Sequence, residues 1–488
     1  MNIKTHRAIK RHTEGKVMAV HLYEHIVDKI ETLIKEQTLH PGDRVPSLRK
    51  LSVQERVSIS TVLQAYFTLE DRGLIEARPQ SGYYVHHKPV QFPSEPKISR
   101  PADSATRVNV SDFVMNMHEV LDAHDAVPFG TATPDPRLLP IRKLNRISSS
   151  ITRREGNLCH TYDFTQGNET LRRHIARRSV EGGCRLTPDD IVITYGCTEA
   201  LHLCLRAVAQ PGDTIAVESP TYFGFLQLIE SLNMKALEIP THPRDGISLD
   251  ALEHSLGKYS VKACLITPNY QNPIGSCMPE TNKKQLVQLL SRRGIPLIED
   301  DIFGDLHFGI QRPRLCKSFD EHELVLTCTS FSKTLSPGFR IGWTAPGRFK
   351  SSVQRLRVTS TLTGSVLPQL TIAEMLSNGA YDHHLRKIRR SYESQIHHVT
   401  NAISKYFPAG TNATRPEGGF LLWVELPAGT DTIELHRKAL EKGISIMPGA
   451  VFSAKRQYKN FIRLNCSNLW SEQLHDALIT LGRLAGRT

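Results

Sequence analysis

Apolar positions in the first part of the chain recur with the period of short helices. Leu22, Ile26, Ile30 and Ile34 fall on one face of a helix, which a stretch rich in proline and glycine then ends. Most of the positions between them, such as Glu24, Asp28 and Lys29, are charged or polar. The pattern predicts an amphipathic helix that packs against further elements in residues 17–87.

Two more helices and a pair of short strands follow in the same region. The pattern predicts helices over 47–54 and 58–71, with Ser58 as a helix N-cap. Two β-like runs, 74–77 and 83–85, are separated by turn residues and predict a hairpin. Helix, helix, helix and hairpin is the element order of a winged helix-turn-helix.

The pattern changes twice further along the chain. Residues 88–124 contain several prolines with little apolar periodicity, which predicts a linker. From residue 125 to 488, short apolar runs such as DIVITYG and DTIAVES alternate with helical stretches. This alternation predicts a mainly parallel sheet with crossover helices, so the fold class is multidomain, α+β followed by α/β.

Composition narrows the class of protein without identifying it. The chain has 488 residues, no apolar run long enough for a membrane span and no apolar core of a signal peptide, so we expect a cytoplasmic protein. Nine cysteines at irregular separations favour reduced thiols over disulfides or a metal site. A net charge of +12 suits a polyanionic partner, but a merely solvated basic surface would give the same value.

Residues 17–87 resemble the GntR type of winged-helix regulator through the motifs PGDRVPSLRKL, VSISTVLQAYFTLEDRGLI and RPQSGYYV. The resemblance implies a DNA partner, with the third helix entering the major groove and the wing lying near the phosphate backbone. Without DNA binding, the same side chains would be ordinary surface groups. The residues that we expect to contact DNA are Arg44, Ser47, Arg49, Ser58, Ser60, Thr61, Gln64 and Arg78.

The match departs from the family pattern at two positions. Arg56 stands where the family usually has glycine, and a left-handed turn there would cost a non-glycine residue roughly 1 kcal/mol. Ile59 stands where an arginine often follows the first serine of the recognition helix. We therefore expect a DNA sequence preference different from the family's common type.

The stretch TSFSKTLSPGFRIGW contains Lys333, which on its own would be an ordinary solvated lysine. A pyridoxal phosphate site needs an amine for the Schiff base, an anion cradle, a carboxylate at the pyridine nitrogen and a group that stacks on the ring. In VITYGCTEAL, a strand, a glycine turn and a helix start place the N–H groups of Cys197 and Thr198 toward a phosphate. An ordinary strand-to-helix turn has the same sequence pattern.

The other parts of such a site follow in order along the chain. Tyr222 offers a flat surface for the ring, although a buried core aromatic is the alternative. Asn272 suits a hydrogen bond to the phenolic oxygen, and Asp300 ends an apolar strand where it would keep the pyridine nitrogen protonated. Ser330 and Arg340 flank the lysine and suit phosphate contacts.

Taken in order, YGCTEAL, SPTY, NPIG, EDD and SFSKTLSPGFRIGW resemble the fold type I aminotransferases over about 125–488. The resemblance implies that Tyr162 reaches the phosphate of a neighbouring subunit, that Arg463 binds a substrate α-carboxylate and that Gly130 lies on a loop over the substrate. It also implies a small subdomain formed by about 125–150 and 365–488.

One feature of those enzymes is absent. They usually carry a tyrosine two or three residues after the pyridine-binding aspartate, and here Ile302 and Phe303 have no hydroxyl. We expect cofactor binding to survive and the proton affinity of the imine to change, which weakens the case for efficient transamination.

A winged helix, a linker and an aminotransferase-like domain in one chain resemble the MocR subfamily of GntR-type regulators. The resemblance implies a head-to-tail homodimer that reads paired half-sites in DNA and senses pyridoxal phosphate or an amino compound through an aldimine at Lys333. The competing hypothesis is a working pyridoxal-phosphate-dependent aminotransferase with an accessory N-terminal domain. The sequence does not identify the effector or the regulated genes.

Overall fold

A computed structural model describes residues 22–36, 38–71, 73–78, 81–86, 93–115, 126–163 and 166–487. The chain divides into two compact units, residues 1–92 and residues 93–488. We refer to them as the reader unit and the cofactor unit, and each is described by itself.

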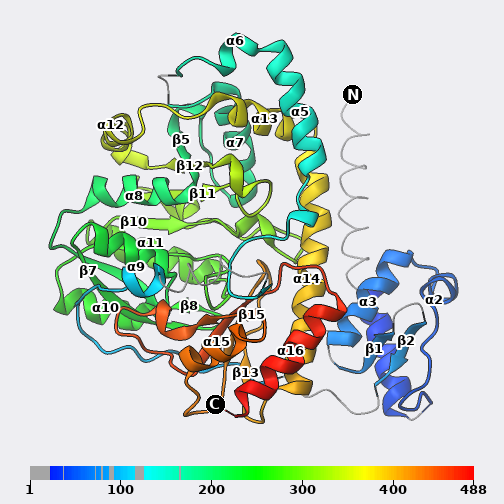
Figure 1. The fold of residues 1–488 in the computed structure, drawn as a ribbon. Coiled ribbons are helices and arrows are strands. Elements are labelled where there is room, and N and C mark those ends of the chain that lie inside the picture. The colour runs from blue at the N-terminus through cyan, green and yellow to red at the C-terminus, as the bar shows by residue number, and fades with distance from the viewer. Residues whose placement is uncertain are drawn as a thin grey trace. The chain divides into compact units, whose positions relative to one another are not determined.

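The reader unit has the predicted order of three helices and a hairpin. A helix over residues 22–35 is followed by α2 (Leu48–Gln54) and α3 (Ile59–Asp71), then by the antiparallel strands β1 (Ile75–Arg78) and β2 (Gly82–Val85) (Figure 1). Apolar side chains from all of these elements form one core, in which Ile26, Val62 and Leu69 are almost fully buried. The predicted winged helix-turn-helix fold is therefore confirmed.

A mixed sheet forms the centre of the cofactor unit (Figure 1). Its strand order is β3-β7-β6-β9-β10-β11-β12-β5, with β8 (Gly246–Ile247) attached to β7. The strands are β3 (Thr106–Arg107), β5 (Val192–Tyr195), β6 (Thr214–Ser219), β7 (Lys235–His242), β9 (Val261–Ile266), β10 (Leu297–Asp300), β11 (Val325–Ser330) and β12 (Ile341–Ala345). The run from β7 to β11 is parallel, whereas β12 is antiparallel to both of its neighbours.

Helices cover both faces of this sheet because successive side chains of its strands point to opposite faces, and both sets are apolar. Ile215 and Val217 of β6 pack in a core with α8 (Gly196–Val208) and α9 (Phe223–Ser231). Ala216, between them, packs on the opposite face with α10 (Leu249–Lys258) and α11 (Glu280–Arg292). Strands buried on both faces read as continuous apolar runs, which explains why the sequence predicted a mainly parallel sheet.

A second, smaller sheet follows the long helix α14 (Ala380–Tyr406). It has the order β13-β14-β17-β16, and a separate strand pair is formed by β15 with β4. The strands are β13 (Asn412–Ala413), β14 (Leu421–Glu425), β16 (Met447–Pro448), β17 (Phe461–Asn465), β15 (Ile444–Ser445) and β4 (Val127–Pro128). The helices α15 (Thr432–Leu440) and α16 (Glu472–Ala485) pack against them in one core.

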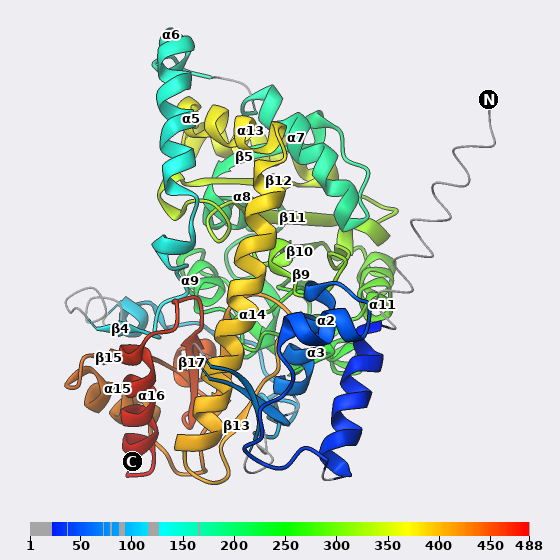
Figure 2. The same ribbon diagram turned by 90° about the vertical axis from the view of Figure 1, so that its right-hand side faces the viewer.

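The two sheets are joined by α14, which contributes to both cores. Its first half, with Tyr381 and Leu385, packs in a core with residues of β5 and β12, and its second half, with Val399 and Ile403, packs against the small sheet. Figure 2 shows the length of this helix beside both parts of the cofactor unit. A single rigid element therefore connects the region around the large sheet with the small subdomain.

The structure differs from the expected subdomain boundaries. The helices α5 (Ile141–Arg154) and α13 (Val366–Ser377) pack together and with α7 (Glu169–Ser179), in the core that also contains residues of β5 and β12. These helices were expected in the small subdomain. They lie instead with the large sheet because α13 packs against both α5 and α7, and all three helices bury apolar side chains in that core.

Residues 93–115 also differ from the prediction, which placed them in a linker. They run along the cofactor unit, where Glu95 pairs with Arg244 at 2.6 Å and β3 pairs with β7. Val108 and Val114 are buried in the large core. Isolated valines between prolines show no periodicity, so this attachment was not visible in the sequence. The remainder of the expected linker, 88–92 and 116–124, lies outside the described residues.

The remaining helical segments are short or peripheral. They are α6 (Gly156–Cys159), α12 (Lys350–Ser360), and the single turns η1 (Pro136–Leu138), η2 (Val180–Gly182), η3 (Pro188–Asp190), η4 (Gly304–Leu306), η5 (Cys316–Phe319), η6 (Pro337–Phe339), η7 (Gly347–Phe349) and η8 (Gly449–Phe452). Among the helices that the structure describes, none combines the length and apolar character that a membrane crossing requires.

Candidate functional site

A cavity of about 230 Å³ lies at the carboxyl ends of the parallel strands of the large sheet. In open α/β sheets this edge is where ligands bind, because the loops that leave the strands carry the polar groups. Most of the residues that the sequence assigned to a cofactor line this one cavity: Cys197, Thr198, Tyr222, Asn272, Asp300, Ser330, Lys333 and Arg340. The structure therefore brings together residues that are up to 143 positions apart in the printed sequence.

Lys333 lies in the turn after β11. Its amine donates a hydrogen bond of 2.7 Å to the carbonyl oxygen of Ala132. Burial and the nearby guanidinium of Arg463 lower the pKa of Lys333 to about 8, although the carboxylate of Asp300 acts in the opposite direction. A neutral amine is the form that attacks a carbonyl group, so this environment prepares the lysine for a Schiff base.

Asp300 ends β10 and faces the same cavity. Its Oδ1 accepts a hydrogen bond from the Cys197 thiol at 3.3 Å and one from the Ile302 N–H at 3.1 Å. Burial raises the pKa of Asp300 to about 7, and these two donors lower it only in part. A pyridinium N–H placed against this carboxylate would satisfy it and favour its ionised form.

Another part of the lining, around Arg340, has groups that suit an anion. Gly196 has a φ of +74°, and Arg340 packs so closely against it that a Cβ would lie 2.4 Å from the guanidinium. Arg340 donates to the carbonyl of Tyr195 at 3.3 Å and contacts the Ser332 hydroxyl at 3.5 Å. The start of α8 adds its N–H groups and the positive end of the helix dipole, which together form an anion-binding end.

Arg463 lies behind Asn272 in the central strand of the small sheet. It is 1% exposed, donates to the Asn272 side chain at 3.3 Å and also donates to the carbonyl oxygen of Gly130. Its Nε has no hydrogen-bond partner, and no carboxylate within the described ranges pairs with it. Burial lowers the pKa of Arg463 to about 10.

Phe303 is one of the two residues that stand where the resemblance to the aminotransferases implies a tyrosine. It is 2% exposed, lines the cavity and packs edge-on against Phe420 with ring centroids 5.4 Å apart. Because this side chain has no hydroxyl, Asn272 is the amide among the lining residues that suits a phenolic oxygen.

Tyr162 is not among the lining residues and is 71% exposed. Its expected role involves a neighbouring subunit and stays a prediction. Sequence reasoning also missed three contributors: the Ala132 carbonyl, the Ser332 hydroxyl and the thiol contact of Cys197. Ser332 had a visible signal in the SFSK motif, whereas a backbone carbonyl has none.

In the reader unit, the start of α3 forms a small cluster of hydroxyl groups. Ser58 caps the helix by accepting from the Thr61 N–H at 3.1 Å, and its hydroxyl lies 2.7 Å from Ser60 and 2.8 Å from Thr61. Gln64 is exposed one turn later. Arg56, in the turn before the helix, has a φ of +53°, so the left-handed turn inferred from the sequence is present.

The other expected DNA contacts lie just before α2, in its first turn and on the wing. Ser47 caps α2 by accepting from the Lys50 N–H at 3.3 Å, and Arg49 is exposed on that helix. The guanidinium of Arg44 lies against Gly82 in the wing, 3.4 Å from the point that a Cβ on this glycine would occupy. Arg78 pairs with Glu76 at 2.7 Å, so its charge is already partly compensated.

Comparison with known proteins agrees with both units. The family of bacterial regulatory proteins named gntR matches residues 22–85, and aminotransferase class I and II matches residues 136–481. The HTH-type transcriptional regulator YdcR of Escherichia coli K12 is 40% identical over 462 residues, which cover 95% of this chain and 98% of YdcR.

Solved structures resemble the cofactor unit. A kynurenine aminotransferase from Pyrococcus horikoshii, in complex with PMP, has a TM-score of 0.72 at 28% identity and covers 77% of this chain and 94% of its own. LysN, an α-aminoadipate aminotransferase from Thermus thermophilus complexed with N-(5'-phosphopyridoxyl)-L-leucine, has a TM-score of 0.70 at 27% identity, with coverage of 78% and 99%. The fold is that of a type I aminotransferase, and the cofactor that it implies is pyridoxal 5'-phosphate.

The enclosed lysine, the carboxylate and the anion-binding end fit that cofactor, and the winged helix is a DNA-binding fold. With a close relative that covers both units, the chain belongs to the MocR type of GntR transcriptional regulators.

Proposed function

We propose that this regulator changes its DNA binding when pyridoxal phosphate, or an amino compound that reacts with it, occupies the cavity around Lys333. The observation that carries the proposal is the buried guanidinium of Arg463, whose Nε lacks a partner beside a cavity that suits the cofactor. A buried donor without a partner costs free energy, and a bound carboxylate would remove that cost. The effector that fits best is therefore an amino acid.

Each residue has a distinct task in this proposal. Lys333 would hold the cofactor covalently, Asp300 its pyridine nitrogen, Asn272 its phenolic oxygen and Arg340 its phosphate, while Tyr222 would cover the ring. The bound cofactor supplies an electrophilic carbonyl and an electron sink. The chain itself orients an incoming amino acid, because Arg463 fixes the carboxylate at the end of the cavity next to Asn272.

The proposed DNA contacts divide into two kinds. Ser60, Thr61 and Gln64, near the start of α3, would reach base edges or phosphates in the major groove. Arg44, Arg49 and Arg78 would contact the backbone and supply affinity that depends on salt. The hydroxyl cluster around Ser58 supports this division, since its members are close together at an exposed helix start.

The assembly and the location follow from the same proposal. A head-to-tail homodimer would carry two reader units and would favour paired half-sites in DNA. Tyr162, which is exposed, would reach the cofactor phosphate of the partner subunit. A bacterial regulator of this type would act in the cytoplasm, where its DNA lies.

A working aminotransferase is the second candidate function. The collected lysine, aspartate and asparagine, with a carboxylate-binding arginine behind them, support it because a half-reaction needs these groups. Phe303 opposes it, since a cavity without the tyrosine hydroxyl lacks one group that tunes proton transfer.

A footprint of the purified protein on the DNA upstream of its own gene tests the leading proposal. We expect protection of paired half-sites that changes when pyridoxal phosphate is added, and a Lys333→Ala variant whose protection does not respond. An unchanged footprint in the native protein, over a panel of amino acids with the cofactor present, would reject effector sensing.

The same panel of amino donors separates the two candidates. Conversion of the bound cofactor to its pyridoxamine form, with release of the keto acid over many cycles, would establish the enzyme. We expect spectral changes without repeated turnover, because Phe303 leaves the cavity without the hydroxyl that tunes proton transfer.

A further inference from the structure

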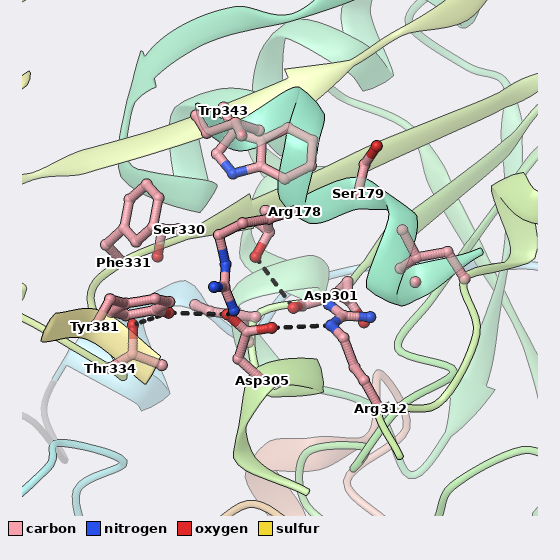
Figure 3. A pocket seen from close by; sticks show the side chains of 15 residues that line it. Arg178, Ser179, Asp301, Asp305, Arg312, Ser330, Phe331, Thr334, Trp343 and Tyr381 are labelled. Carbon is pink, nitrogen blue, oxygen red and sulfur yellow. Dashed lines mark hydrogen bonds and ion pairs between the residues drawn. The ribbon is translucent and has the colours of Figure 1, made fainter. Parts of the chain in front are cut away.

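A partly buried network of charged and hydroxyl groups lies next to the cofactor cavity (Figure 3). It surrounds a second, much smaller cavity of about 50 Å³ between α7, the loop after β10, the turn after β11 and the start of α14. The proposed function uses none of its members directly. Five of them, labelled in Figure 3, form one connected path: Thr334, Tyr381, Asp305, Arg312 and Asp301.

Tyr381, in the first turn of α14, lies in the middle of the path. Its hydroxyl donates to Asp305 Oδ2 at 2.8 Å and lies 3.0 Å from the hydroxyl of Thr334. Asp305 in turn accepts from the Arg312 Nε at 2.8 Å, and another nitrogen of Arg312 donates to Asp301. The Tyr381 ring is 2% exposed, so the hydroxyl makes these contacts away from water.

The charges of the network hold it together. Burial alone would raise the pKa of Asp305, but Arg312 and Arg178 lower it well below its usual range. Arg178 also lies over the Tyr381 ring, with its guanidinium carbon 4.6 Å from the centroid, and pairs with Asp382 at 2.5 Å. Asp305 is therefore ionised at neutral pH and accepts its hydrogen bonds strongly.

The two ends of the path, Thr334 and Asp301, adjoin the two residues that would hold the cofactor through an amine and a carboxylate. Thr334 follows Lys333 in the sequence, and Asp301 follows Asp300. A flat, rigid ring can engage an amine and a carboxylate at once only if the distance between them is fixed. The backbone is tied at Asp301, whose carbonyl accepts from the Thr329 hydroxyl at 3.0 Å.

We propose that Tyr381 is a positioning residue for the cofactor: its hydroxyl, through Thr334 on one side and Asp305 on the other, fixes Lys333 relative to Asp300. The inference rests on pyridoxal phosphate binding in the neighbouring cavity. Tyr381 does not line that cavity and acts only through the residues that it holds.

The chain provides a matched control on the same helix. Tyr392 is also fully buried in α14, but its hydroxyl has no hydrogen-bond partner among the described residues. Tyr381→Phe and Tyr392→Phe therefore remove the same atom from the same helix, and only the first substitution breaks the path.

The test titrates pyridoxal phosphate into cofactor-free full-length protein and follows the visible absorbance over a range of pH. We expect Tyr381→Phe to bind pyridoxal phosphate roughly five- to tenfold more weakly, as the loss of the hydroxyl that contacts Asp305 and Thr334 allows. The pH midpoint of its absorbance should also differ from that of the native protein. Tyr392→Phe should match the native protein in both measurements.

A second pair of variants keeps the test informative if Tyr381→Phe folds poorly. Thr334→Val removes the hydroxyl at the lysine end of the path and should reproduce the loss of affinity. Thr334→Ser retains the hydroxyl and should bind pyridoxal phosphate with native affinity. Melting temperature is measured for every variant.

The outcomes distinguish the two levels of the argument. Native affinity and a native pH midpoint in both Tyr381→Phe and Thr334→Val would overturn the positioning role and leave the regulator proposal intact. Equal weakening in Tyr392→Phe would also overturn it. No binding by the native protein would overturn both proposals.

Discussion

The reader unit and the cofactor unit treat their candidate functional groups in opposite ways. At the start of α3, Ser60 and Gln64 are exposed to solvent. Around the cofactor cavity, Lys333 and Asp300 are enclosed, have fixed partners and have shifted pKa values. An exposed side chain forms its stabilising contacts only when DNA binds, whereas an enclosed side chain is already held in position before its ligand binds. Single substitutions should therefore have larger effects in the cofactor unit.

The largest effect is expected at Lys333. Replacing it with alanine removes the only covalent attachment proposed for pyridoxal phosphate, so the cofactor should be lost on dialysis, with affinity reduced more than about 100-fold. Absorbance of the dialysed protein measures this loss. DNA binding without cofactor should persist in the same variant, and a variant that keeps its visible band would contradict the assigned attachment.

Arg463→Ala should come next in magnitude. The variant should retain pyridoxal phosphate but bind amino acids about 10- to 150-fold more weakly, because one charge-assisted pair contributes about 1.5–3 kcal/mol. Spectral titration with an amino acid and with the matching amine that lacks a carboxylate measures the difference. Arg463→Lys, which keeps the charge and loses the planar fork, serves as the control. Equal losses for both ligands would reject the carboxylate role.

In the reader unit, Gln64→Ala and Arg49→Ala should separate sequence reading from general affinity. Gln64→Ala should cost about 1–3 kcal/mol on the specific site and little on random DNA. Arg49→Ala should weaken both kinds of DNA and reduce the slope of log affinity against log salt by about 1. Mobility-shift titrations at several salt concentrations measure both. An effect of Gln64→Ala that is uniform over sequences would assign it to the backbone.

The enclosed amine predicts a pH dependence that an exposed lysine would not show. With a pKa of Lys333 lowered to about 8, the neutral, reactive fraction rises roughly tenfold between about pH 7 and 9 and then levels off. The rate at which cofactor-free protein captures pyridoxal phosphate should follow this curve. Stopped-flow absorbance provides the measurement, and a rate that keeps rising toward the usual pKa of lysine would contradict the enclosed environment.

The smallest effect concerns the turn before α3. Arg56→Gly relieves a left-handed conformation but adds freedom to the unfolded chain, so the reader unit should gain at most about 1 kcal/mol. Glu323→Gly, at a φ of +56° in the cofactor unit, is the matched control. Urea unfolding followed separately for each transition measures the changes. A clear loss of stability in Arg56→Gly would show that the arginine side chain outweighs the strain of its backbone.

The sequence predicted the cofactor cavity well because its residues follow strands. Asp300 ends β10, Asn272 follows β9 and Lys333 follows β11, and the carboxyl ends of parallel strands meet at one edge. The same reasoning located the recognition helix, since Ser58 and the turn at Arg56 are local signals. Periodicity and turn chemistry are properties of neighbouring residues, so one sequence is enough to show them.

Contacts between distant segments had no such signal. Tyr381 lies 47 residues from Thr334 and 76 from Asp305, and nothing in its local sequence marks it as a partner of either. Residues 93–115 looked like a linker because their attachment depends on a few valines and one short strand. Pairings of this kind are set by the tertiary fold. In the sequence, a buried tyrosine with a partner looks the same as one without.

Arg340 approaches Gly196 so closely that a substitution at Gly196 would impair cofactor binding and leave the fold of the reader unit intact. The guanidinium occupies the space of a single missing methyl group, in a turn that only glycine adopts without strain. A cell that carried alanine at Gly196 would produce a regulator that does not respond to pyridoxal phosphate but still has its complete reader unit. Such an allele would reveal, in a living population, which genes respond to the protein itself and which respond to its ligand.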